Sequence, residues 1–115
     1  MIELTIDLLR ATYDLLNLTT PFDKWNLPDG EDIEFRVIKD KTCFGYYNVE
    51  NSKHVIAISN AKNGHLNTIQ MSMAHEMVHM IQHRNCTLTS NHHDRAFRRL
   101  AKEVCDIHGW DLKMF

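Results

Sequence analysis

The chain has 115 residues, of which 43% are hydrophobic and 24% are charged, with a formal net charge of −2. This length leaves room for one hydrophobic core, so we expect a single domain over residues 1–115. The composition is that of an ordinary globular protein, and it excludes collagen-like, disordered and disulfide-framework classes.

The sequence also indicates the cellular compartment. No apolar run approaches the roughly 20 residues that cross a bilayer. The first residues include Glu3 and Asp7 where a secretory signal would carry Lys or Arg. Cys43, Cys86 and Cys105 are odd in number and form no C-x-x-C pair, which is typical of reduced thiols. We therefore expect a cytoplasmic protein without a membrane helix.

The first half of the chain predicts one helix and three strands. Leucines recur at helical spacing over residues 2–18, and a loop with both prolines comes next. Apolar and charged residues alternate over 33–37, and residues 42–49 and 54–59 are rich in β-branched and aromatic residues. With a turn at 50–53, these segments predict a three-stranded antiparallel meander.

The second half predicts two helices. Asn67 suits an N-cap for a helix that runs to about His83. Residues 84–92 are polar and break the pattern, after which apolar residues recur at helical spacing over 94–108 until Gly109 ends the helix. The order helix, three strands, helix, helix predicts an α+β fold.

The second predicted helix contains the motif His75-Glu76-Met77-Val78-His79, an H-E-x-x-H. Two histidines four residues apart lie about 40° from each other around a helix, so both imidazoles can reach one metal ion. Glu76 is rotated by about 100° from His75, which suits a general base beside a metal-bound water. The alternative is a pair of solvent-facing histidines on an amphipathic helix.

A catalytic zinc site needs a third protein ligand and one open position. Asn85 stands where the metzincin spacing would place a histidine, which excludes that class. His83 continues the row of histidines but lies too far along a straight helix to share the ion, so we expect it to be exposed. His92 and His93, at the start of the next helix, are better candidates, and Glu103 is a rival carboxylate ligand.

The H-E-x-x-H helix and the start of the next helix resemble the SprT-like zinc metallopeptidases. In that family the H-E-x-x-H precedes an H-x-x-x-F at the start of the next helix, which His93 and Phe97 match. The stretch 42–59, a hairpin that leads into an I-x-I-S strand, is also similar. The resemblance covers about residues 40–110.

The resemblance implies a zincin-like fold that binds one Zn²⁺ and hydrolyses peptide bonds in a protein or peptide substrate. It implies His75, His79 and His93 as zinc ligands and Glu76 as the catalytic base. Larger members carry a Cys-rich zinc ribbon after the protease core. This chain resembles a minimal core without the ribbon, of viral or mobile-element type, and a viral member would act in the host cytoplasm.

Positive charge is concentrated near the end of the chain. Residues 1–83 have a net charge of −4, whereas residues 84–115 have +2. Four basic residues fall at i, i+3, i+4 and i+7 of the last predicted helix, namely Arg95, Arg98, Arg99 and Lys102. Because family members include proteases that act on DNA-crosslinked proteins, this stripe could contact phosphates. The alternative is an ordinary solvated helix face.

The sequence also allows two different functions for the same residues. The protein could be a zinc-stabilised module that binds protein or DNA without catalysis, or a gluzincin-like peptidase with Glu103 as third ligand.

The strand 54–59 could lie at a sheet edge and pair with an extended substrate, or it could be an interior strand. Candidate donors to the reaction's oxyanion are Tyr46, Tyr47, His92 and Arg95.

Overall fold

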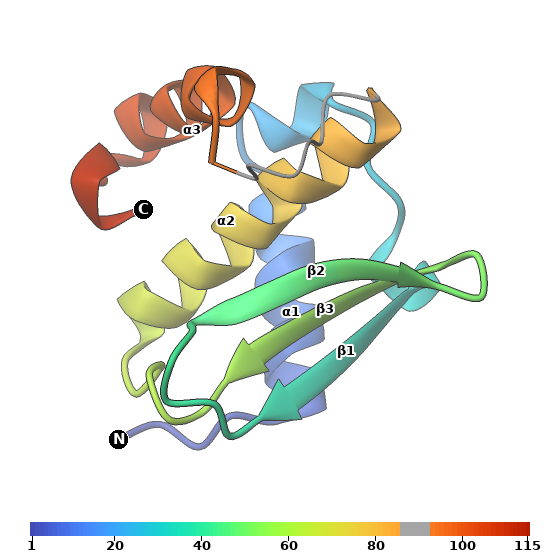
Figure 1. Ribbon diagram of the computed structural model, residues 1–115, viewed down its shortest axis with the longest axis vertical. Coiled ribbons are helices and arrows are strands. Elements are labelled where there is room, and N and C mark those ends of the chain that lie inside the picture. The colour runs from blue at the N-terminus through green and yellow to red at the C-terminus, as the bar shows by residue number, and fades with distance from the viewer. Residues whose placement is uncertain (86–92) are drawn as a thin grey trace.

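The computed structural model describes residues 1–85 and 93–115, so Cys86 and His92 lie outside the described residues. It confirms the α+β class, with three helices and a three-stranded sheet (Figure 1). The main elements are, in order, α1 (Ile6–Asn17), β1 (Ile33–Ile38), β2 (Gly45–Glu50), β3 (Lys53–Ser59), α2 (Leu66–Arg84) and α3 (Arg95–His108). Short 3-10 turns are η1 (Phe22–Lys24), η2 (Gly30–Asp32) and η3 (Leu112–Met114). None of the helices described combines the length and the apolar character that a membrane crossing requires.

The strand order is β1-β3-β2, so the predicted antiparallel meander is wrong. The sheet is mixed, because β3 pairs parallel with β1 and antiparallel with β2. Every residue from Val55 to Ser59 is buried, on both faces of β3. A strand buried on both faces is favoured between two neighbours, whose side chains help to cover it. β3 is therefore central, and β2 forms an edge that runs beside α2 (Figure 1).

The two connections within the sheet differ in length. The turn at 50–53 is a tight hairpin in which Asn51 and Ser52 have φ angles of 51° and 63°. Two consecutive positive φ angles are the requirement of a type I′ turn, which suits the twist of paired strands. The connection over 39–44 is longer and carries the chain past the end of β3 to its far side. The expected turn at Asp40 lies inside this connection, where its carboxylate accepts a hydrogen bond from the main chain of Thr42 at 2.7 Å.

Helix α1 covers one side of the core through Leu9, Tyr13 and Leu16. It begins later than predicted because Thr5 is its N-cap and accepts a hydrogen bond from the main chain of Leu8 at 3.1 Å. Helix α3 lies beside α2 (Figure 1) and ends, as predicted, at Gly109 in the left-handed conformation.

Helix α2 is the centre of the fold, because it packs against α1, α3 and both β2 and β3. Most of its side chains between Ile69 and Gln82 are buried, including the fully buried Met73 and Met77. Its N-cap is His65, so the helix begins earlier than the predicted N-cap Asn67 would allow. A helix enclosed in this way has little freedom to shift against its neighbours.

A buried polar network ties α2 to the sheet. Ser72 donates a hydrogen bond to the side-chain oxygen of Asn63 at 2.6 Å. The Asn63 amide in turn donates to the main-chain oxygens of Ser59 at 2.7 Å and Phe44 at 3.0 Å. Ser59 ends β3 and Phe44 precedes β2, so this network fixes the edge strand relative to the helix that carries the H-E-x-x-H.

The central position of β3 gives the first prediction. Ile56 is fully buried in the core, so Ile56→Ala should lower the free energy of unfolding by about 2–5 kcal/mol, measured by urea denaturation. Val49 on the edge strand is 37% exposed, so Val49→Ala should change that free energy by only about 0.5 kcal/mol. Similar losses for the two variants would contradict the strand order.

Candidate metal centre

Three of the predicted ligands lie together in the structure. His75 and His79 come from α2, and His93 lies just before α3. One nitrogen from each ring falls in a group whose members all lie within 4.8 Å of one another. The ring centroids are 4.9 Å apart for His75–His79 and His75–His93, and 5.2 Å apart for His79–His93. Tetrahedral zinc with bonds of about 2.0–2.1 Å separates its ligand nitrogens by about 3.4 Å, so small side-chain adjustments would suffice.

The local structure explains how the third imidazole reaches the other two. Asp94 is the N-cap of α3, and its carboxylate accepts a hydrogen bond from the main chain of Phe97 at 3.2 Å. This cap fixes where α3 starts and therefore where the preceding His93 lies. Since α3 packs against α2, the start of α3 brings His93 beside the pair on α2.

Phe97 joins the three imidazoles into one cluster. Its ring centroid lies 4.7 Å from that of His79 and 4.9 Å from those of His75 and His93. The side chain is only 4% exposed. The spacing H-x-x-x-F places Phe97 one helical turn after His93, so this phenylalanine forms an apolar wall against which all three rings pack.

Two hydrogen bonds orient the rings on α2. Nδ1 of His75 lies 2.7 Å from the main-chain oxygen of Phe115, and Nδ1 of His79 lies 3.1 Å from Oε1 of Gln82. Both oxygens are acceptors, so each Nδ1 carries the proton and donates it, which leaves Nε2 unprotonated and able to bind a metal. Burial lowers the pKa of His75 to about 4, which keeps this imidazole in the neutral form that binds metals.

The chain after α3 folds back to supply one of these acceptors. The indole of Trp110 donates a hydrogen bond to the side-chain oxygen of Asn67 at 3.1 Å. The ring of Phe115 stacks on those of Phe97 and Trp110, with centroids 6.2 Å and 6.1 Å away. These contacts hold residues 110–115 against the same side of α2 as the three imidazoles.

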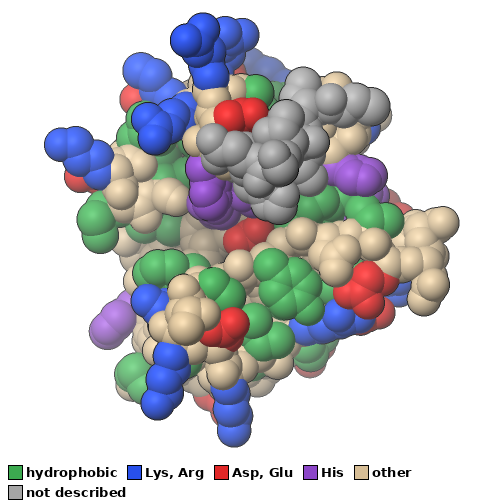
Figure 2. Space-filling view, viewed as in Figure 1, with side chains coloured by type: hydrophobic (Ala, Val, Ile, Leu, Met, Phe, Trp, Pro, Cys, Tyr) green, Lys and Arg blue, Asp and Glu red, His purple; other side chains and the backbone are tan. Residues whose placement is uncertain are grey.

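Glu76, which follows His75 in α2, is buried, with 4% of its surface exposed. Removal from water disfavours its charged form and raises the pKa of Glu76 to about 8. A cavity of about 500 Å³ adjoins the cluster, and its walls include His75, His93, Phe97 and Arg98. Figure 2 shows histidine side chains gathered beneath the basic side chains of α3, at the hollow between α3 and the sheet. The donor set and the adjoining space therefore fit a metal ion with room for a further ligand.

The other candidate residues lie elsewhere. Glu103 is exposed on α3 and, among the described residues, does not belong to the histidine group. His83 is exposed, as predicted. The hydroxyl of Tyr46 accepts a hydrogen bond from Arg36 at 3.3 Å, and that of Tyr47 is hydrogen-bonded to His54 at 2.7 Å. His92 is outside the described residues.

Sequence reasoning did not find Gln82 or Phe115. Gln82 stands three residues after His79, and an i, i+3 polar partner on the same helix is a signal that could have pointed to it. Phe115 contributes a main-chain oxygen from 40 residues further along the chain, and no local pattern encodes that contact.

Together the fold and the site define an α+β protein with a three-histidine candidate metal centre, two of whose histidines come from an H-E-x-x-H helix and the third from the start of the next helix. The family profile described as the SprT-like family matches residues 10–113, and the chain belongs to this family. No curated protein and no solved structure matched the chain.

The contact between Phe115 and His75 gives a second prediction. Phe115→Ala should loosen the main-chain oxygen that orients His75 and weaken zinc binding by about tenfold, measured by competition with a chromogenic chelator. Met114 is 74% exposed, so Met114→Ala is the matched control and should bind zinc as the wild type does. Equal affinities for the two variants would mean that the returning segment does not support the ligand.

The burial of Glu76 gives a third prediction, for the metal-free protein. The folded chain keeps the Glu76 proton up to about pH 8, whereas the unfolded chain releases it near pH 4.5. Wild-type stability should therefore fall between these pH values relative to Glu76→Gln, by about 3 kcal/mol at pH 7. Chelator-treated samples unfolded by urea at several pH values would measure this. The buried amide of the variant adds a constant offset, so curves that stay parallel with pH would contradict the prediction.

Proposed function

We propose that this protein is a zinc-dependent endopeptidase in which His75, His79 and His93 hold one Zn²⁺. The observation that carries the proposal is the convergence of three imidazoles next to a cavity, on a helix in which the buried Glu76 directly follows His75. Bound zinc would supply the acidity of a coordinated water and polarise the peptide carbonyl. Membership of the SprT-like family supports the same activity.

Glu76 would act as the general base and then as the general acid. Its burial raises its affinity for a proton, which suits a group that must accept a proton from water and pass it to the leaving amine. A cation held by the neighbouring imidazoles would favour the carboxylate form at the start of the reaction. The low exposure of Glu76 limits exchange of that proton with bulk water.

The edge strand β2 is the element best placed to orient an extended substrate. Of the two positions that the sequence allowed for strand 54–59, β3 occupies the interior one, because it pairs on both sides. Among the described residues β2 pairs with β3 alone, and it runs beside the helix that carries the metal ligands. Its main-chain groups could therefore pair with a substrate peptide drawn across the metal centre.

We further propose that the substrates include DNA-associated proteins in the cytoplasm, or in the host cytoplasm for a viral gene. Arg95, Arg98, Arg99 and Lys102 are all exposed on α3. Arg98 also lines the cavity at the metal centre, so a nucleic acid on this stripe would lie close to the reaction site. Lys102 pairs with Asp106 at 2.5 Å, which leaves the three arginines as the main phosphate contacts.

The fourth prediction tests the activity. Wild type and Glu76→Gln should each retain one zinc per chain, whereas only the wild type should cleave casein and a DNA-bound protein. We expect a loss of at least about 10²-fold in the variant, and stimulation of the wild type by single-stranded DNA. Zinc in both proteins without any cleavage would favour a non-catalytic binding module.

A matched pair of variants tests the third ligand. His93→Ala should lose zinc retention and cleavage, whereas Glu103→Ala should keep both, because Glu103 is exposed and outside the histidine group. The reverse result would favour the gluzincin-like alternative.

A further inference from the structure

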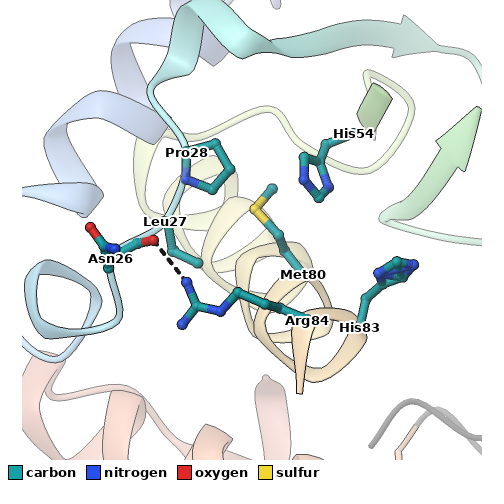
Figure 3. A pocket seen from close by; sticks show the side chains of 7 residues that line it. All are labelled: Asn26, Leu27, Pro28, His54, Met80, His83 and Arg84. Carbon is teal, nitrogen blue, oxygen red and sulfur yellow. Dashed lines mark hydrogen bonds between the residues drawn. The ribbon is translucent and has the colours of Figure 1, made fainter. Parts of the chain in front are cut away.

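A second cavity, of about 470 Å³, lies further along α2 than the metal centre (Figure 3). Three elements form its walls: the loop 26–28, His54 at the start of β3, and the last turns of α2. The residues from α2 are Met80, His83 and Arg84. None of the three candidate metal ligands lines it, so this cavity is separate from the one beside the imidazoles.

The walls of this cavity combine apolar side chains with three side chains that carry nitrogen donors. Leu27, Pro28 and Met80 provide the apolar side chains (Figure 3), and Met80 is 1% exposed. His54 and His83 lie at one end of the cavity, whereas the guanidinium of Arg84 lies at the other end beside Asn26 and Leu27, with Met80 between them (Figure 3). No aspartate or glutamate is among the described residues that line it.

Hydrogen bonds hold Arg84 and His54 in place before any ligand arrives. Arg84 donates one hydrogen bond to the main-chain oxygen of Asn26 at 2.7 Å and another to that of Trp25. A guanidinium has five N–H donors, so others remain for a ligand. His54 is hydrogen-bonded to the Tyr47 hydroxyl at 2.7 Å through Nδ1. Burial and the nearby His83 lower the pKa of His54, so Arg84 is the permanent positive charge on these walls.

The cavity lies close to β2, the strand proposed to bind the substrate. His83 follows the candidate ligand His79 by one helical turn, which is a rise of about 6 Å. Tyr47 of β2 packs against the rings of His83 and His54, with centroids 6.1 Å and 5.9 Å away. An extended peptide advances about 3.3 Å per residue, so the cavity is about two residues away from the metal centre.

We propose that this cavity binds an acidic side chain of the protein substrate, a glutamate about two residues from the scissile bond. The carboxylate would accept hydrogen bonds from the guanidinium of Arg84, and the methylene groups would pack on Leu27 and Met80. Charge-assisted hydrogen bonds to a guanidinium held in place are the strong kind, and the apolar walls accommodate the stem of the side chain. This inference rests on the proposed peptidase function.

The test compares peptide substrates that carry Glu or Gln at successive positions around the cleaved bond. For one position the wild type should show a kcat/KM about tenfold higher for Glu than for Gln. Arg84→Met should abolish this ratio, whereas Lys39→Met, at an exposed position just after β1, should keep it. A wild-type ratio near one at every position would overturn the proposal.

A second variant covers the case in which loss of the Arg84 contacts impairs folding. His83 is exposed, so His83→Glu should fold normally and should lower kcat/KM for the Glu peptide by about tenfold through charge repulsion. His65→Glu, at the opposite end of α2, is the matched control and should keep the wild-type ratio of kcat/KM between the Glu and Gln peptides. Equal ratios in the two variants would overturn the proposal.

A binding measurement separates this proposal from the peptidase function. Zinc-loaded Glu76→Gln protein is titrated with the blocked pentapeptides Ala-Ala-Glu-Ala-Ala and Ala-Ala-Gln-Ala-Ala, and the imidazole NMR signals of His54 and His83 are followed. The Glu peptide alone should shift these signals. If the wild type cleaves no peptide, the peptidase function fails, and this titration still decides what the cavity binds. Equal shifts with both peptides would overturn the acidic preference.

Discussion

The burial of α2 is the constraint on which the rest of the structure depends. The sheet, α1 and α3 each cover one side of this helix, so almost every position in its middle must be apolar or must have a polar partner. Ser72 finds its partner in Asn63, and His79 finds one in Gln82. Glu76 differs from these residues because it is an acid, and burial makes its charged form costly. That cost is a physical argument for the proposed role of Glu76 as a general base.

The helices could be read from the sequence because their periodicity is local. The shared face of the H-E-x-x-H histidines is predictable from the same periodicity, since two residues four apart on a helix must lie on one side of it. The strand order could not be read in this way, because alternation shows which residues share a face of a sheet and says nothing about which strands are neighbours. The apolar run in 54–59 predicts a buried strand, and burial on both faces from Val55 to Ser59 fits a central position that the run alone does not specify.

The residues of the candidate site also differ in how far local sequence predicts their positions. The proximity of His75 and His79 is a property of one helix, whereas His93 reaches them only because α3 packs back on α2. The resemblance to a family supplied His93, where the spacing alone left His92 and Glu103 open. The acceptor for His75 depends on residues 110–115 returning to α2, a contact fixed by Trp110 and Asn67, which are 43 positions apart. Such contacts depend on the assembled tertiary structure and have no short-range sequence signature.

The position of His93, just outside α3, also affects the chain as a whole. An ion shared by His79 and His93 would act as a cross-link that closes the segment between α2 and α3 into a loop. As with a disulfide, such a closure restricts the unfolded chain and favours the docked arrangement of the two helices. Zinc binding and the docking of α3 on α2 would then be linked equilibria. The fraction of molecules with α3 docked would therefore rise with the concentration of free zinc.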